Sequence, residues 1–207
     1  MARSYAWSLR QAGFTSSYAD PDVWTKPNVK ADGFKYLEYV LVYVDEKQVI
    51  LHNPKIIREY LASWYTLKDN SVKEPDEYLG AQIRKYDLPG TEDSTCWSMS
   101  CDRYVIREVA GVQRKLPNSN LALNNKVSTP LSTGYRAAID VSPELDANPA
   151  NYFQYLIEVL WWIIELGSVD ILTPVTMLSL FSAAPRQGHL EQVLHVFAYL
   201  KAHDRSS

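Results

Sequence analysis

Two adjacent acidic residues, Asp45 and Glu46, interrupt an otherwise apolar part of the chain. The run Tyr39–Val44 precedes them, and a second apolar stretch, Val49–Leu51, follows after two polar residues. This pattern predicts two antiparallel strands joined by a tight turn, with both carboxylates at its tip. Carboxylates held there could bind a divalent cation, because hard cations prefer oxygen ligands. The alternative is that both are solvated turn residues, a common role for acidic side chains.

The sequence around this hairpin predicts the elements that would position it. Asp32–Gly33 is a strong signal for a hairpin turn. Asn53 followed by Pro54 indicates a helix start, because Asn caps the first turn and Pro fits inside it. The predicted elements of this half are a helix over 4–12, strands starting at 23, over 34–43 and over 48–52, and a helix over 53–67.

The later sequence predicts a second hairpin and then helices. Residues 117–148 are rich in Asn, Ser, Pro and Leu, which favours a long irregular connector. Helical spacing of apolar residues follows it. The predicted elements are strands over 78–83 and 96–100, a helix capped by Ser100, and helices starting at Asn148, at Thr173 and at Gln187. The predicted fold class is α+β: a small antiparallel sheet with helices, followed by an all-helical C-terminal unit.

The composition is that of a folded domain, and its charge argues against strong independent binding of nucleic acid. The chain has 207 residues, 46% of them hydrophobic and 22% charged, which is enough apolar material for a packed core. The formal net charge is -3. Proteins that bind nucleic acid independently are usually basic, because they must neutralise phosphates. Two cysteines, Cys96 and Cys101, are too few for a disulfide scaffold or a zinc site and are expected as free thiols.

The sequence carries no signal for secretion or membrane insertion. Its first residues lack the long apolar run of a secretory signal, which predicts a cytoplasmic or nuclear location. The most apolar segment, 156–164, is too short to cross a bilayer and contains Glu158, so we expect no membrane partner. His189, His195 and His203 share the last predicted helix at spacings that do not bring them together, and we interpret them as surface or edge residues.

Six short segments together resemble the reverse transcriptase of copia-type retrotransposons, in order and spacing, over roughly residues 5 to 203. The hairpin Tyr43–Glu46 is similar to the family's Tyr-Val-Asp-Asp motif. The other segments are 12–24 (Gly-Phe, Ser, Asp-Pro), 77–83 (Leu-Gly), 98–105 (Ser, Tyr-Val), 127–131 (Ser-Thr-Pro-Leu) and 189–201 (His, Tyr-Leu-Lys). The resemblance implies a partial polymerase palm over 1–116, a connector over 117–148 and a helical thumb or connection-like region over 149–207.

The resemblance also implies an RNA-directed DNA polymerase, a nucleotidyltransferase that uses magnesium or manganese. Asp45 and Glu46 match the two aspartates of the family motif, so they are the implied catalytic and metal-binding residues. Tyr43 matches the position that lies near the template-primer and is the implied cofactor-binding residue. The implied partner is an RNA or DNA template-primer, bound weakly or not at all here, and the chain could belong to a longer polyprotein.

Two departures from the family put catalysis in doubt. Glu46 replaces the second aspartate and moves its carboxylate out by one methylene, and magnesium tolerates little distortion of its coordination. The family's other metal aspartate lies upstream of the part that this chain matches. We therefore expect a retrotransposon fragment that is inactive alone. The alternatives are an enzyme completed by another chain, and a retained non-catalytic module that binds a partner. We also expect the hairpin to have an unpaired edge and an uncovered apolar face.

Overall fold

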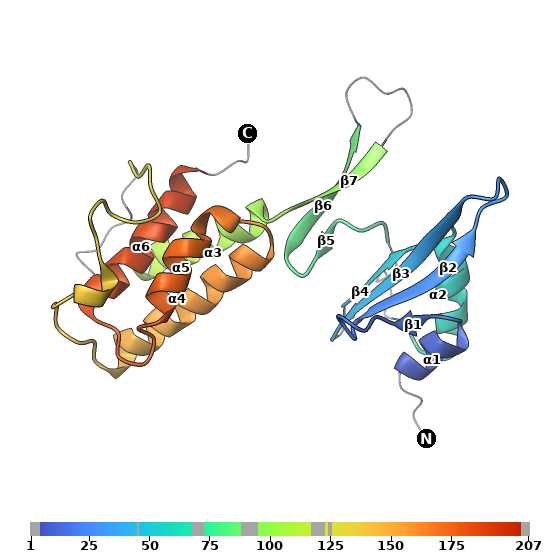
Figure 1. Ribbon diagram of the computed structural model, residues 1–207, viewed down its shortest axis with the longest axis horizontal. Helices are drawn as coiled ribbons and strands as arrows, with labels where there is room; N and C mark the ends of the chain where they lie inside the picture. Colours follow the sequence, from blue (N-terminus) through green and yellow to red (C-terminus); the bar gives the residue numbers. More distant parts are fainter. Residues whose placement is uncertain are drawn as a thin grey trace. The chain divides into compact units, whose positions relative to one another are not determined.

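The computed structural model describes residues 5–44, 46–67, 73–87, 95–116, 123 and 126–203 (Figure 1). The chain divides into two compact units, Met1–Leu79 and Gly80–Ser207. Helices combine with antiparallel sheets, which confirms the predicted α+β class. Across the described residues, no helix combines the length and the apolar character needed to cross a membrane.

The first unit is a four-stranded antiparallel sheet with two helices (Figure 1). The strand order is β1-β2-β3-β4, so β3 pairs on both sides, while β1 and β4 are the edge strands among the described residues. Its elements are α1 (Tyr5–Gln11), β1 (Thr15–Ser16), β2 (Val23–Val29), β3 (Lys35–Tyr43), β4 (Glu46–Ile50), α2 (Pro54–Ala62) and the two-residue strand β5 (Glu77–Tyr78).

Local signals in the sequence produce most of these boundaries. Gly33 has φ +87° in the turn between β2 and β3, a conformation that glycine adopts without steric cost. The side chain of Asn53 accepts a hydrogen bond from the backbone N–H of Lys55 at 3.3 Å, so the predicted cap of α2 is confirmed. The helix is shorter than predicted and ends at Ala62. There the hydroxyl of Ser63 donates to the carbonyl of Tyr60 at 2.6 Å.

One face of this sheet is covered by the helices and the other is not. The buried core of the unit gathers side chains from the sheet, from α1 and α2, and from the loop between α1 and β1: Leu9, Phe14, Trp24, Val40, Ile57 and Leu61. The outer face leaves Leu37 47% exposed and Ile50 54% exposed. The predicted strand over 34–43 pairs on both sides, so the unpaired edge of the hairpin among the described residues is β4. The outer face is uncovered, as the sequence predicts, and exposed apolar surface of this kind favours association.

The second unit contains one hairpin and a helical bundle. Its elements are β6 (Ala81–Asp87), β7 (Thr95–Ser100), α3 (Asp102–Lys115), the 3-10 helix η1 (Ala137–Ile139), α4 (Ala147–Glu165), the 3-10 helix η2 (Val169–Ile171), α5 (Leu172–Ser179) and α6 (Gln187–Ala202). β6 and β7 pair antiparallel, with Gln82 opposite Ser100. Figure 1 shows α3, α4, α5 and α6 packed side by side. Their shared core includes Val109, Phe153, Leu160, Val193 and Phe197.

Two predicted boundaries in this region are wrong. The predicted strand over 78–83 is broken, because Leu79 (φ 53°) and Gly80 (φ 85°) both adopt the left-handed conformation and form a turn. Gly80 also fits closely, since a Cβ there would lie 3.0 Å from the ring of Tyr104. The cap of α3 is Cys101 rather than Ser100, although the Ser100 hydroxyl still accepts a hydrogen bond from the N–H of Asp102 at 3.2 Å.

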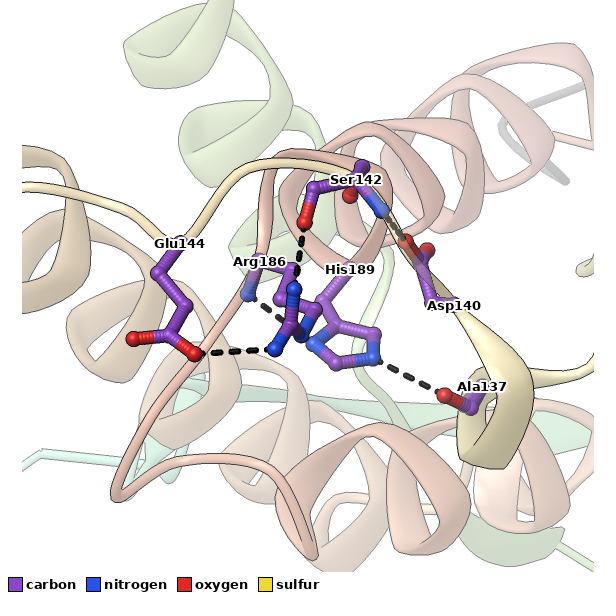
Figure 2. Close-up of polar contacts among 6 residues, drawn as sticks. All are labelled: Ala137, Asp140, Ser142, Glu144, Arg186 and His189. Carbon is purple, nitrogen blue, oxygen red and sulfur yellow. Dashed lines mark hydrogen bonds and ion pairs between the residues drawn. The ribbon is translucent and has the colours of Figure 1, made fainter.

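The irregular segment 126–146 is tied to α6 by polar side chains of the helix (Figure 2). His189 is 1% exposed, so its interpretation as a surface residue is wrong. Its Nδ1 accepts from the N–H of Arg186 at 3.0 Å, and its Nε2 lies 3.1 Å from the carbonyl oxygen of Ala137. The ring stacks on Phe181 at 4.3 Å. His189 thus caps its own helix and anchors the connector.

Further side chains extend this attachment. The guanidinium of Arg186 donates to the carbonyl of Ser142 at 2.7 Å and to Glu144 at 2.8 Å, as Figure 2 shows. Burial alone would raise the pKa of Asp140, but hydrogen bonds from Ser142 and Tyr135 outweigh it and lower that pKa. The carboxylate of Asp140 lies against Gly188 in the first turn of α6, where an anion is favourable.

Glycine at position 188 is required by this contact, because a Cβ there would collide with the carboxylate of Asp140. We predict that Gly188→Ala destabilises the chain by roughly 1–3 kcal/mol. Gly111, inside α3, is the matched control: nothing lies within 4 Å of an added Cβ. Gly111→Ala should stabilise by up to about 1 kcal/mol. Urea unfolding followed by circular dichroism measures both; a Gly188→Ala chain as stable as Gly111→Ala would contradict the packing described.

Among the described residues, the buried hydroxyl of Tyr5 has no hydrogen-bond partner, and burial followed by the nearby Tyr65 raises its pKa to about 12. We predict that Tyr5→Phe raises stability by about 1 kcal/mol, because it removes an unsatisfied group. The neutral phenol is the form that the folded state favours. The wild-type chain should therefore lose extra stability between about pH 10 and about pH 12, and Tyr5→Phe should not.

The control for this prediction is Tyr65→Phe, since the hydroxyl of Tyr65 lies 2.7 Å from Oγ of the fully buried Ser8. That change breaks a hydrogen bond and should destabilise. Chemical unfolding from neutral to alkaline pH separates the two variants. An equal loss of unfolding free energy in Tyr5→Phe and Tyr65→Phe would show that the hydroxyl of Tyr5 has a hydrogen-bond partner.

Candidate acidic site at the hairpin tip

The tip of the β3–β4 hairpin is where the sequence places its acidic pair. Tyr43 and Glu46 are the last paired residues of the two strands, and Val44 has φ 48° in the turn. A two-residue loop with positive φ suits the right-handed twist of a hairpin. Glu46 therefore occupies the predicted position. Asp45, the other predicted catalytic and metal-binding residue, lies outside the described residues.

Glu46 has a structural role that the sequence alone does not reveal. Its Oε2 accepts a hydrogen bond from the backbone N–H of Leu79 at 2.9 Å. Leu79 is the first of the two residues with positive φ that follow β5, so the carboxylate holds this turn close to the hairpin tip. A charged acceptor makes this bond stronger than a neutral one. One of the two oxygens of Glu46 is thus already engaged by the protein.

Two further carboxylates lie at the same end of the sheet. The backbone N–H of Val42 donates to the carbonyl of Asp22 at 2.9 Å, which sets the start of β2 beside the end of β3. Burial raises the pKa of the Tyr78 hydroxyl, and the charges of Glu46, Asp22 and Asp20 raise it further. The phenol of Tyr78 therefore lies near negative charges from two segments of the chain, Glu46 at the hairpin and Asp20 and Asp22 before β2.

Asp20 and Asp22 were part of a matched sequence segment but were not predicted as site residues. The signal that could have identified them is the strand register: Val23 pairs with Leu41, so the residues just before Val23 must lie next to the hairpin tip. Register of this kind depends on knowing which strands pair. The proximity of Asp20 and Asp22 to the hairpin tip can therefore be recognised only once the strand pairing is known.

The described residues, which leave out Asp45, do not by themselves form a complete metal site. No group of three His, Cys, Asp or Glu side chains among them is arranged to hold a metal ion. A two-metal centre needs several shared carboxylate oxygens. The pair of magnesium or manganese ions that the resemblance implies would therefore need Asp45 and further donors besides those described.

Tyr43, the predicted template-primer contact, lies on the outer face of the sheet and is 44% exposed. It shares that face with Leu41 and Tyr39, since residues two apart along a strand point the same way. Its position leaves the ring accessible beside the acidic tip.

Two variants of Glu46 test its hydrogen bond to the amide of Leu79, because only one of them keeps an acceptor. Glu46→Gln keeps an acceptor but removes the charge, whereas Glu46→Ala removes both. We predict that the Leu79 amide stays protected from hydrogen exchange in Glu46→Gln and loses protection in Glu46→Ala. Both variants should lower the pKa of Tyr78 towards its ordinary value. Amide exchange and a phenol titration by NMR measure these effects; an unprotected Leu79 amide in the wild-type chain would disprove the contact.

Comparison with known proteins finds a similarity to a transposon protein. No family model matches the chain, and no solved structure matches it. The chain is similar to the protein of Saccharomyces cerevisiae named "Putative transposon Ty5-1 protein", with 29% identity over 166 residues. The match covers 78% of this chain and 48% of the relative, so the chain spans about half of that protein's length. This similarity supports a transposon-related origin for the chain.

Proposed function

We propose that this chain is a fragment of a copia-type retrotransposon reverse transcriptase, an RNA-directed DNA polymerase, that retains the acidic hairpin of the palm but does not catalyse nucleotide transfer alone. The observation that carries the proposal is the β3–β4 hairpin, which holds Tyr43 and Glu46 opposite each other on either side of a tight turn. The similarity to a transposon protein over 78% of the chain supports the same origin.

In this proposal, Asp45 and Glu46 are the remnants of the catalytic and metal-binding pair. Tyr43 is the remnant of the template-primer contact. The palm comprises 1–116, the connector 117–148 and the thumb or connection-like part 149–207. A cytoplasmic or nuclear location, and a place in a longer polyprotein, belong to the same proposal.

The expected loss of activity rests on the position of the Glu46 carboxylate. It stands one methylene further from the backbone than that of aspartate, and the amide of Leu79 fixes its direction through Oε2. A displaced carboxylate works against the tight octahedral geometry that magnesium requires.

A primer-extension assay tests the proposal directly. The full chain is incubated with an RNA template, a DNA primer, deoxynucleotides and either magnesium or manganese. We predict no incorporation above that of Asp45→Ala with either metal, and none for Glu46→Asp, which restores the family motif. Incorporation by the wild-type chain that Asp45→Ala abolishes would show an active enzyme. Incorporation by Glu46→Asp alone would locate the whole defect at this one side chain.

A second candidate function, a non-catalytic module that binds a protein partner, rests on the outer face of the first sheet. This face combines exposed apolar side chains with a free edge at β4. The exposed side chains are Val29, Leu37, Tyr43 and Ile50. The net charge of -3 makes a protein a better partner for it than nucleic acid.

Nucleic-acid binding and self-association together separate the two candidates. For either one we expect weak binding of a fluorescent RNA–DNA hybrid at physiological salt, because the 24 acidic residues outnumber the 21 basic ones that could neutralise phosphates. Fluorescence anisotropy measures it. Tight binding that is lost in Tyr43→Ala would favour the polymerase-derived surface, whereas its absence together with self-association reduced by Leu37→Lys would favour the protein-binding face.

A further inference from the structure

A cavity of about 840 Å³ lies within the first unit, between the covered face of the sheet and α2. It is away from the acidic hairpin tip: none of the residues that line it belongs to the segment 43–46. Its walls include the rings of Phe14, Tyr36 and Tyr60 and the aliphatic side chain of Ile56. A cavity of this size with apolar walls and a few polar groups is typical of a small-molecule site.

The exposed carboxylate of Asp32 and the buried carboxylate of Glu38 both line this cavity. Glu38 is only 8% exposed, and it lies on β3 two residues before the fully buried Val40, on the covered face of the sheet. That position is normally apolar in a half-buried strand. A buried carboxylate is costly unless it is paired, so its presence here needs a partner.

Protein groups satisfy only one of its two oxygens. Oε1 of Glu38 accepts from the side-chain amide of Asn28 at 3.1 Å and from the hydroxyl of Tyr36 at 3.4 Å. Among the residues that the structure describes, no hydrogen bond or ion pair reaches Oε2. Asn28 is itself fixed, because its Oδ1 accepts from the N–H of Val29 at 2.8 Å. The second oxygen therefore keeps its capacity to accept.

The lysines Lys26 and Lys30 line the cavity, and each lies near another group. Lys26 lies directly opposite Glu38 in the β2–β3 register, but its Nζ donates to the carbonyl of Ala12 at 3.0 Å and lies 5.5 Å from the ring of Phe14. No ion pair within 4.0 Å joins Lys26 to Glu38 in the described part of the chain. Lys30, which also lines the cavity, has its Nζ 5.4 Å from the ring of Phe34.

The aromatic walls suit a flat ligand body. Tyr36 and His52 meet edge to face with ring centroids 6.4 Å apart, so two ring systems lie together beside the carboxylate. Flat apolar groups gain dispersion and ring-edge contacts in such surroundings. A planar cationic head can in addition donate two parallel N–H bonds to a carboxylate.

We propose that this cavity is a binding site for a small organic cation with a flat apolar body and an amidinium or guanidinium head, which donates to the free oxygen of Glu38. The aromatic and aliphatic walls hold the body. The site does not depend on the polymerase-derived function, since Tyr43 and Glu46 do not line it.

Benzamidine is the probe for this proposal, with neutral benzamide as its control of the same shape. The full chain is titrated with each, and binding is followed by NMR shifts of the Tyr36, Glu38 and His52 amides. Benzamidine should bind and shift these amides, and benzamide should bind about tenfold more weakly or less. Failure of benzamidine to bind, or equal binding of the two, overturns the proposal.

Two matched variants locate the interaction. Glu38→Gln keeps an acceptor for Asn28 and Tyr36 but removes the negative charge, and it should weaken benzamidine binding by about tenfold or more. Glu59→Gln, an exposed residue of α2 that does not line the cavity, should leave binding unchanged. Unchanged binding in a folded Glu38→Gln overturns the proposal. If that variant does not fold, the comparison of the two ligands on the wild-type chain decides.

Discussion

The pairing of β3 on both of its edges is the constraint on which the first unit depends. The register that sets Trp24 opposite Val40 also sets Lys26 opposite Glu38, and the register with β4 sets Tyr43 opposite Glu46. A slip of one residue would turn every side chain to the other face. One strand register therefore determines three features: the acidic tip, the cavity around Glu38 and the exposed outer face.

Local signals in the sequence were sufficient to predict much of this fold. The turn at Asp32–Gly33 and the cap at Asn53 each depend on a few neighbouring residues, and both are found as predicted. Helix α6 begins at Gln187, as predicted, for the same reason, since its apolar spacing is regular. The position of Glu46 at the hairpin tip follows from the same kind of pattern.

The features that the sequence did not predict are those set by distant partners. Glu46 binds the amide of Leu79, 33 residues away, and no local pattern marks either residue for the other. His189, Gln192 and His195 bind backbone groups of the connector, which carry no sequence signal because every residue has them. A polar residue in an amphipathic helix is interpreted as exposed by default. Here the polar side chains of α6 instead form hydrogen bonds with backbone groups of the irregular connector.

The close fit between Asp140 and Gly188 also bears on how the sequence can change over time. The carboxylate fills the space that a side chain at position 188 would occupy, so neither position can be altered freely while the other stays as it is. A relative with a small residue at 140 has room for alanine at 188. These two positions are 48 residues apart. They should therefore co-vary among relatives, with glycine at 188 occurring where position 140 is aspartate.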